Sequence, residues 1–189
     1  MFRTPVIRTS ALIAALALGP CGVPAAAADV PSPLQPLVDA AAQRLQTADP
    51  VAAVKLRTGG QIEDPQREQQ VIDAVTADAS ARQIDPAYVR DVFRNQIDAT
   101  VAIEHSLIGQ WKLDPAAAPA TAPDLAASRT TIDRLNHTMV DEIAGQWPTL
   151  HGPSCAADLT SAVEAVAAAR GLDALYRRAL DYATQSYCR

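Results

Sequence analysis

The chain has 189 residues and a formal net charge of −5 at pH 7. Hydrophobic residues make up 49% of it, but aromatic residues only 4%. Acidic and basic residues are mixed along it, which argues against nucleic acid or an anionic membrane surface as the main partner. Residues 29–189, which follow an N-terminal leader, are numerous enough for one domain with its own core.

The leader, residues 1–28, has the pattern of a secretory signal peptide. Arg3 and Arg8 precede an apolar run, Ala11–Leu18, which is shorter than the roughly 20 residues that a membrane-spanning helix needs. Three consecutive alanines then supply small residues for cleavage. We therefore expect a cleaved signal peptide, a mature domain over residues 29–189, and a secreted or periplasmic protein without a membrane anchor.

Two cysteines remain in the predicted mature chain, Cys155 and Cys188. An even pair in an oxidising compartment indicates a disulfide. It would close a loop of about 34 residues and stabilise the fold by about 3–4 kcal/mol on the chain-entropy estimate. Metal binding is the weaker interpretation, because the three histidines do not stand at ligand spacing: His105, His137 and His151.

The mature sequence has helical periodicity throughout, and no segment alternates like a strand. Asp64-Pro65 and Asp85-Pro86 each place an N-cap residue before a proline at the first helical position. In the first predicted helix, Pro50 indicates a kink or restart with Asp49 as cap. The sequence predicts an all-α, single-domain bundle of about six helices, over residues 34–59, 65–83, 86–112, 125–147, 156–170 and 172–187.

The predicted helix over residues 86–112 carries polar groups on its apolar face. At about 100° per residue, Thr100 and Glu104 fall within the same stripe as Phe93, Ile97 and Ile108. A carboxyl group among such neighbours loses much of its hydration, which raises its pKa unless cations or donors offset the loss. On its own this pattern fits a glutamate with a partner in the core, so what matters is whether cations meet it.

Cations do break the apolar faces of other predicted helices. Arg44 and Lys55 are eleven residues apart, so on an unbroken helix they differ by only about 20° around the axis. Arg67 lies in the first turn of its helix, and Arg129 lies near the start of another. One such side chain could extend to solvent with only its stem buried, but several pointing inward indicate an anionic ligand.

Together these groups predict a pocket for a small dianion. Arginine binds carboxylates through two parallel hydrogen bonds, while lysine and a protonated glutamic acid can each donate to a single oxygen. The sequence has no cysteine or serine nucleophile with an adjacent base, no metal-ligand cluster and no cofactor fingerprint. Any chemistry would therefore act by positioning and electrostatics, without a cofactor.

From about Leu34 to Cys188 the sequence resembles the all-helical (type II) chorismate mutases, specifically their exported bacterial class. The resemblance lies in four stretches: AAAQRLQTADPVAAVKLRTGGQIEDPQREQQ, IDPAYVRDVFRNQIDATVAIEHSLIGQWKL, PDLAASRTTID and ATQSYC. It implies conversion of chorismate to prephenate, a cofactor-free pericyclic rearrangement in aromatic amino acid biosynthesis. The match of several residues at fixed separations is far more specific than any single motif.

The resemblance also implies roles for the cationic residues. Arg44 and Arg129 match positions that hold substrate carboxylates or their surroundings, and Arg67 matches another binding arginine. Lys55 matches the lysine that donates to the ether oxygen of the substrate. In small cytosolic members one arginine comes from a partner chain, whereas the resemblance to the exported class implies that Arg129 serves that role within one chain. A homodimer is compatible with the sequence but not demanded by it.

The remaining positions are polar or acidic. Glu104 falls where many cytosolic relatives have a glutamine that donates to the ether oxygen, so Glu104 must be protonated in the active complex. Asp64 and Glu68 match positions near the substrate hydroxyl, and Thr100 matches a hydroxyl-bearing position beside a carboxylate. Two other functions remain open. A secreted helical protein that binds a small dicarboxylate without turnover is the main alternative, and a purely structural helical module leaves the inward cations unexplained.

Overall fold

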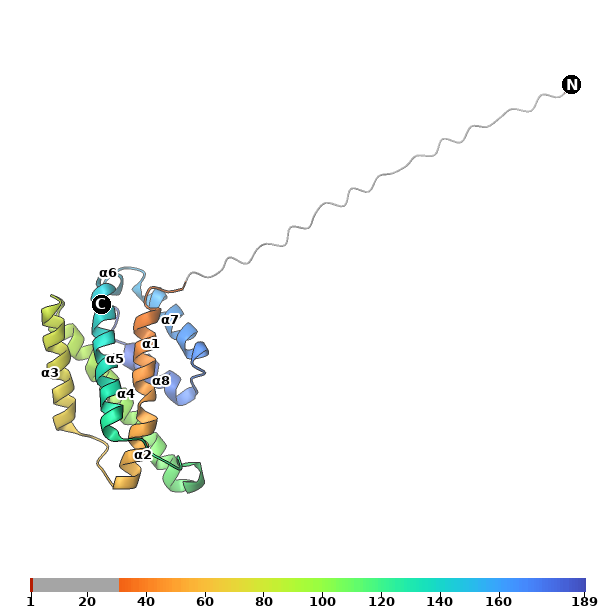
Figure 1. Cartoon of the computed structure of the whole chain (residues 1–189). Helices are drawn as coiled ribbons and strands as arrows, with labels where there is room; N and C mark the ends of the chain where they lie inside the picture. Colours follow the sequence, from red (N-terminus) through yellow and green to blue (C-terminus); the bar gives the residue numbers. More distant parts are fainter. Residues whose placement is uncertain (2–30) are drawn as a thin grey trace. The chain divides into compact units, whose positions relative to one another are not determined.

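Helices joined by short loops make up the described part of the chain, which in this computed structural model comprises Met1 and residues 31–189. Apart from Met1, the predicted signal peptide lies outside these residues. Within them there is no strand, and the all-α prediction is confirmed (Figure 1). In chain order the elements are α1 (Gln35–Gln46), α2 (Ala48–Thr58), α3 (Pro65–Ala81), α4 (Pro86–Leu113), the 3₁₀ turn η1 (Pro115–Ala117), α5 (Leu125–Gly145), α6 (Trp147–Leu150), α7 (Cys155–Ala169) and α8 (Ala174–Thr184).

The first predicted helix is in fact two helices, and the break lies earlier than expected. It falls at Thr47, whose hydroxyl donates to the carbonyl of Arg44 at 2.6 Å. Pro50 lies in the first turn of α2, where its missing N–H costs no helical hydrogen bond. Asp49 does not cap this helix, and its carboxylate instead accepts a hydrogen bond from the hydroxyl of Tyr176 at 2.9 Å. The prediction of a restart at Pro50 with Asp49 as cap was wrong.

The starts of α3 and α4 follow the sequence signals. The side chain of Asp64 accepts from the backbone N–H of Arg67 at 3.1 Å, and that of Asp85 accepts from Ala87 at 2.8 Å. Gly59 ends α2 in the left-handed conformation, with φ of 70°, which suits a residue without a side chain. The loop that follows contacts α2 before α3 begins, since the carbonyl of Ile62 accepts a hydrogen bond from Lys55.

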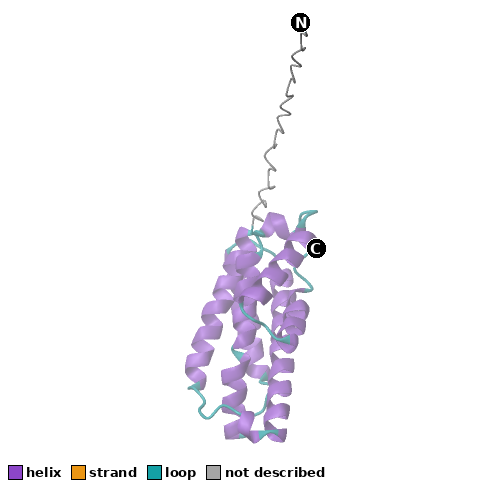
Figure 2. Ribbon diagram, turned by 90° about the vertical axis from the view of Figure 1, so that its right-hand side faces the viewer, coloured by secondary structure: helices purple, strands orange, loops and turns teal. Residues whose placement is uncertain are grey.

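The 28-residue helix α4 is the centre of the bundle. It packs against α8, α3 and α2, while α1 packs against α5 and α7. In Figure 2 the long helices run side by side, so each buries an apolar stripe against two or more neighbours. Phe93, Leu45 and Met139 are among the fully buried core side chains. Within the described residues, no helix is both long and apolar enough to span a bilayer.

A disulfide joins Cys155, at the start of α7, to Cys188 after the end of α8, as the sequence predicted. The neighbouring Tyr187 is completely buried, and its carbonyl accepts a hydrogen bond from the hydroxyl of Tyr88 at 2.6 Å. The C-terminal segment is therefore attached to both α7 and α4. By closing a loop between residues 33 apart, the bond stabilises the fold by about 3–4 kcal/mol on the chain-entropy model.

Candidate active site

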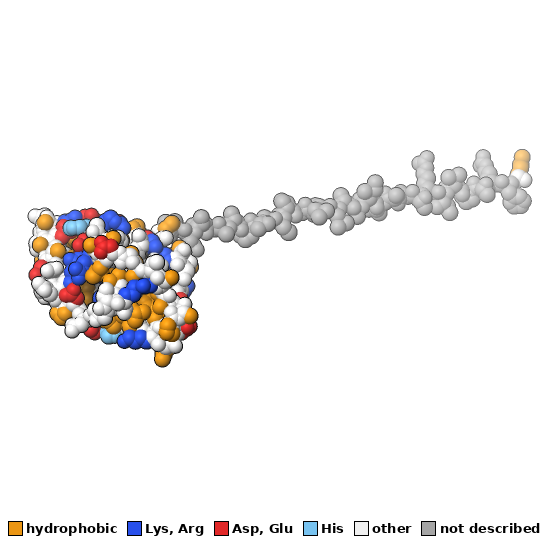
Figure 3. Space-filling view, turned by 60° about the horizontal axis from the view of Figure 1, so that its bottom comes forward, with side chains coloured by type: hydrophobic (Ala, Val, Ile, Leu, Met, Phe, Trp, Pro, Cys, Tyr) orange, Lys and Arg blue, Asp and Glu red, His pale blue; other side chains and the backbone are white. Residues whose placement is uncertain are grey.

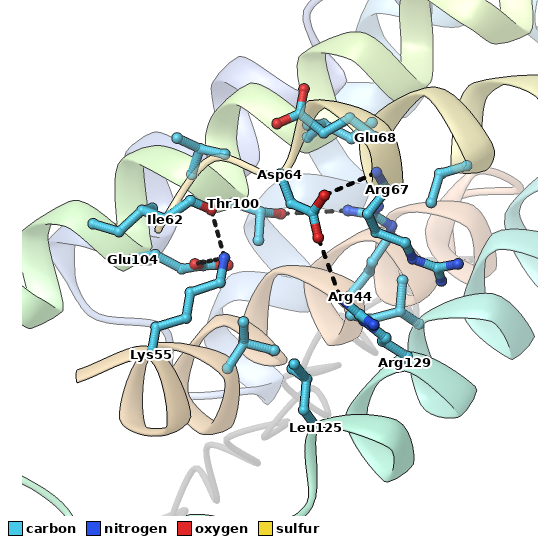
Figure 4. Close-up of a pocket in the computed structure, with 15 residues that line it drawn as sticks. Arg44, Lys55, Ile62, Asp64, Arg67, Glu68, Thr100, Glu104, Leu125 and Arg129 are labelled. Atoms are coloured by element: carbon cyan, nitrogen blue, oxygen red, sulfur yellow. Dashed lines mark hydrogen bonds and ion pairs between the residues drawn. The ribbon is translucent and has the colours of Figure 1, made fainter. Parts of the chain in front are cut away.

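A pocket bounded by helices α1 to α5 contains all eight ligand-binding residues expected from the sequence (Figure 4). Its wall is completed by apolar side chains that come from the same helices and from the loop before α3. Basic and acidic side chains lie among apolar ones on the face shown in Figure 3. The residues that line the pocket are Arg44, Val51, Lys55, Ile62, Asp64, Arg67, Glu68, Val71, Ile97, Thr100, Val101, Glu104, Leu125, Arg129 and Ile132.

Helix ends place most of the charged side chains. Arg44 and Lys55 come from the last turns of α1 and α2, where cations also interact favourably with the helix dipole. Arg67 comes from the first turn of α3, and Arg129 lies near the start of α5. The break at Thr47 does not separate Arg44 from Lys55, because both still reach the same pocket. Thr100 and Glu104 extend from the middle of α4, one turn apart.

Lys55 and Glu104 form a partly buried ion pair in this pocket. The ammonium nitrogen of Lys55 lies 2.6 Å from Oε2 of Glu104 and donates to the carbonyl of Ile62 at 2.5 Å. Burial raises the pKa of the Glu104 carboxyl above its usual value, and the hydrogen bond and charge of Lys55 oppose that rise. An ammonium has three N–H donors, so these two contacts leave one donor for a ligand.

Arg44 is held by two uncharged acceptors. Its Nε donates to Oδ1 of Asn136 at 2.7 Å, and its Nη1 donates to the hydroxyl of Thr100 at 3.3 Å. The residue is only 4% exposed, and burial, reinforced by nearby Arg67, lowers its pKa to about 10. It therefore stays charged at neutral pH. Among residues 31–189 no carboxylate lies within ion-pair distance of it, and Nη2 makes no hydrogen bond there.

Carboxylates do pair with the arginines nearer to solvent. Nη2 of Arg67 lies 2.5 Å from Oδ1 of Asp133, and Nη2 of Arg129 lies 3.2 Å from Oδ2 of Asp64. Arg129 is 45% exposed and Asp133 is 50% exposed. Ion pairs as accessible as these contribute little energy, so a ligand carboxylate can replace either acidic partner.

Several contacts of the pocket had no signal in the sequence. Asp133 lies four residues after Arg129 on α5, but in the sequence nothing distinguishes it from an ordinary surface aspartate. The Ile62 carbonyl belongs to a loop, so only the folded chain brings it to Lys55. Glu68 lines the pocket while its carboxylate pairs with Arg94 at 3.1 Å, a partner that was not expected.

The histidines lie apart from one another. His105 contacts Glu63 at 2.8 Å, His137 contacts Asp78 at 3.1 Å, and His151 packs against Trp147. In the part of the chain that the structure describes, no group of three or more histidine, cysteine, aspartate or glutamate residues is arranged to hold a metal ion.

Comparison with known proteins identifies the family. Residues 35–105 match the model of chorismate mutase type II. The chain is 67% identical over 179 residues to a secreted chorismate mutase of Mycolicibacterium smegmatis, covering 95% of this chain and 99% of that protein. It is 52% identical over 171 residues to a secreted chorismate mutase of Mycobacterium tuberculosis, covering 90% and 86% respectively.

A solved structure agrees with these sequence matches. The crystal structure of a chorismate mutase from Burkholderia phymatum superimposes with a TM-score of 0.79 at 34% identity, covering 84% of this chain and 97% of that one. The chain belongs to the all-helical chorismate mutases. Both relatives from the mycobacteria are named as secreted chorismate mutases.

Proposed function

We propose that the pocket converts chorismate to prephenate by a rearrangement within one bound molecule. In this reaction the carbon–oxygen bond of the enolpyruvyl ether breaks as a new carbon–carbon bond forms, and no atom leaves the substrate. The observation that carries the proposal is the pairing of Lys55 with Glu104, two groups able to donate to one oxygen, at 2.6 Å inside a cationic pocket.

The rate enhancement comes from fixed donors at the atom whose charge changes. Negative charge builds on the ether oxygen as the bond breaks, so the ammonium of Lys55 stabilises the transition state more than the ground state. Its contacts with Ile62 and Glu104 hold it in place before the substrate arrives. Holding the flexible ether side chain in its compact reactive geometry lowers the entropic part of the barrier.

We assign the two substrate carboxylates to the arginines. Arg44 and Arg129 hold them directly, Arg67 adds a further cationic contact, and Thr100 supports the carboxylate near Arg44. The unpaired Nη2 of Arg44 and the exposed, replaceable acidic partners of Arg67 and Arg129 support this assignment. Bidentate arginine contacts of this kind fix the orientation of a carboxylate as well as its position.

The acidic residues have two different tasks in this proposal. Asp64 and Glu68, at the start of α3, lie beside the substrate hydroxyl, and one of the two carboxylates accepts its hydrogen bond. Glu104 is protonated in the complex and donates to the ether oxygen together with Lys55. Burial already raises the pKa of Glu104, and a bound dianion raises it further because like charges disfavour the ionised carboxylate.

We propose that the enzyme works outside the cytoplasm, on a small-molecule substrate. The sequence of residues 1–28 has the signal-peptide pattern, and both curated relatives are named secreted. Every group assigned to the reaction comes from one chain, so the pocket needs no residue from a partner, whether or not the protein forms a homodimer.

The test is the loss of chorismate absorbance on mixing with the purified, oxidised protein lacking residues 1–28, with prephenate identified as the product. We expect catalytic turnover without added metal or cofactor. If the folded protein binds chorismate but leaves it unchanged, it is a dicarboxylate-binding protein and the proposed activity is wrong. If it does not bind chorismate, the whole assignment of the pocket is wrong.

A further inference from the structure

One face of α5 carries three polar residues, each paired with a side chain from another segment. They are Arg129, Asp133 and Asn136, at positions i, i+4 and i+7, which lie on the same side of a helix. Arg129 contacts Asp64, Asp133 contacts Arg67, and Asn136 contacts Arg44. This face therefore supplies one cation of the pocket and holds two others.

The partners differ in charge and in burial. Asp133 is a half-exposed carboxylate, whereas Asn136 is a buried amide that is 5% exposed. At 2.7 Å the amide oxygen of Asn136 accepts the Nε–H of Arg44 without adding a negative charge. The second acceptor of Arg44, the hydroxyl of Thr100, is also neutral and donates in turn to the carbonyl of Gln96 at 2.8 Å.

A carboxylate at position 136 would give Arg44 the same hydrogen bond with a different result. Two opposite charges at such a distance in a buried site attract strongly and neutralise each other. The guanidinium would then have much less attraction for a ligand anion. The neutral amide orients Arg44 while leaving its positive charge and its Nη2 edge available.

We infer that Asn136 is a positioning residue that orients Arg44 toward a substrate carboxylate and, because it is uncharged, keeps Arg44 able to bind that carboxylate. The inference rests on the proposed function, in which Arg44 binds the substrate. It assigns to Asn136 an effect on substrate affinity, since Asn136 acts through Arg44 and is not among the residues that line the pocket.

The test is Asn136→Asp, which keeps the size and the hydrogen-bond acceptor but adds a charge. We expect KM for chorismate to rise by about tenfold to a hundredfold, the range for losing a charged hydrogen bond, with kcat within about threefold of native. Asn95→Asp is the matched control, because the Asn95 amide bonds to Ser186 at 2.9 Å outside the pocket. It should leave KM unchanged.

An Asn136→Asp protein that is folded by thermal unfolding and has native KM would overturn the inference. If that variant does not fold, Asn136→Leu replaces it. Leucine has nearly the shape of asparagine but no acceptor for the Nε–H of Arg44, so KM should rise, and a folded Asn136→Leu protein with native KM would overturn the inference. Because the native protein is measured alongside, failure of the proposed function appears separately, as native protein that does not consume chorismate.

Discussion

The two sides of the pocket hold their cations in opposite ways. On the inner side, Arg44 is buried and bonded only to neutral oxygens, and Lys55 faces a carboxyl group whose pKa is raised by burial. On the outer side, Arg67 and Arg129 are paired with carboxylates that lie half in solvent. In the proposed mechanism, Arg44 thus keeps its charge directed at a ligand, and Lys55 does so once Glu104 is protonated. The outer groups exchange one anionic partner for another when a ligand binds.

From this difference we infer which residues contribute most to binding energy and rate enhancement. A charge in a water-poor site acts on a ligand through a low effective dielectric, whereas an exposed charge is screened by water and salt. Substitutions on the inner side should therefore have large effects and those on the outer side small ones, although both sides carry formal positive charges.

The largest effect is expected for Lys55→Ala. Losing a preorganised donor to a developing negative charge lowers kcat by roughly two orders of magnitude or more. Steady-state kinetics of chorismate consumption measure this, with Lys112→Ala as control because Lys112 is exposed near the end of α4 and lies outside the pocket. A Lys55→Ala enzyme within about threefold of native kcat would remove Lys55 from the mechanism.

The next prediction concerns the protonation of Glu104. Its pKa is raised in the folded protein by burial, and only the protonated form can donate. We expect kcat to be highest below the pKa of Glu104 in the complex and to fall as pH rises through it. Glu104→Gln, which donates at every pH, should flatten this fall.

The control for the pH profile is His105→Gln, since His105 lies beside the pocket and pairs with Glu63. This variant should keep the native fall in kcat. A Glu104→Gln profile that still fell like the native one would show that another group titrates.

A smaller difference should separate Arg44→Lys from Arg129→Lys. Each change keeps the positive charge and loses the planar fork of the guanidinium. In Arg44→Lys it also leaves Asn136 without its 2.7 Å hydrogen bond in a buried site, so kcat/KM should fall by about tenfold or more. For the exposed Arg129 the fall should stay below about threefold. Equal losses in the two variants would contradict the distinction between the inner and outer sides.

The smallest effect is expected for Asp133→Asn. Removing this carboxylate frees Arg67 from its 2.5 Å ion pair, so KM for chorismate should decrease, by no more than about threefold because the pair is exposed. Asp141→Asn is the control on the same helix, since Asp141 pairs with Arg82 away from the pocket. A large rise in KM for Asp133→Asn would mean that Asp133 holds Arg67 in the binding position.

Local rules of helix formation made the fold largely predictable. Asp64-Pro65 and Asp85-Pro86 gave the starts of α3 and α4, where the caps form as expected. The break near Pro50 was misplaced because proline is tolerated in a first turn, and the actual break depends on the hydroxyl of Thr47. The described residues also contain the four-residue α6 in place of a simple turn, and their helices exceed the six or so expected.

The candidate site was predictable where a charge interrupted an apolar stripe. Arg44, Lys55 and Glu104 were found in this way, and the structure brings them into one pocket. The sequence did not show which groups hold these three side chains in place, because the contacts join segments far apart in the sequence. Asn136 bonds to Arg44 across 92 positions, and Ile62 contributes only its backbone carbonyl.

Asp64 uses its two carboxylate oxygens for two tasks, since Oδ1 caps α3 and Oδ2 contacts Arg129. A mutational scan that scores only cellular activity would therefore combine two distinct defects at this position, a frayed helix and a weakened ligand contact. Asparagine caps helices about as well as aspartate but carries no charge. Comparing asparagine with alanine at position 64 would separate protein abundance from substrate affinity in such data.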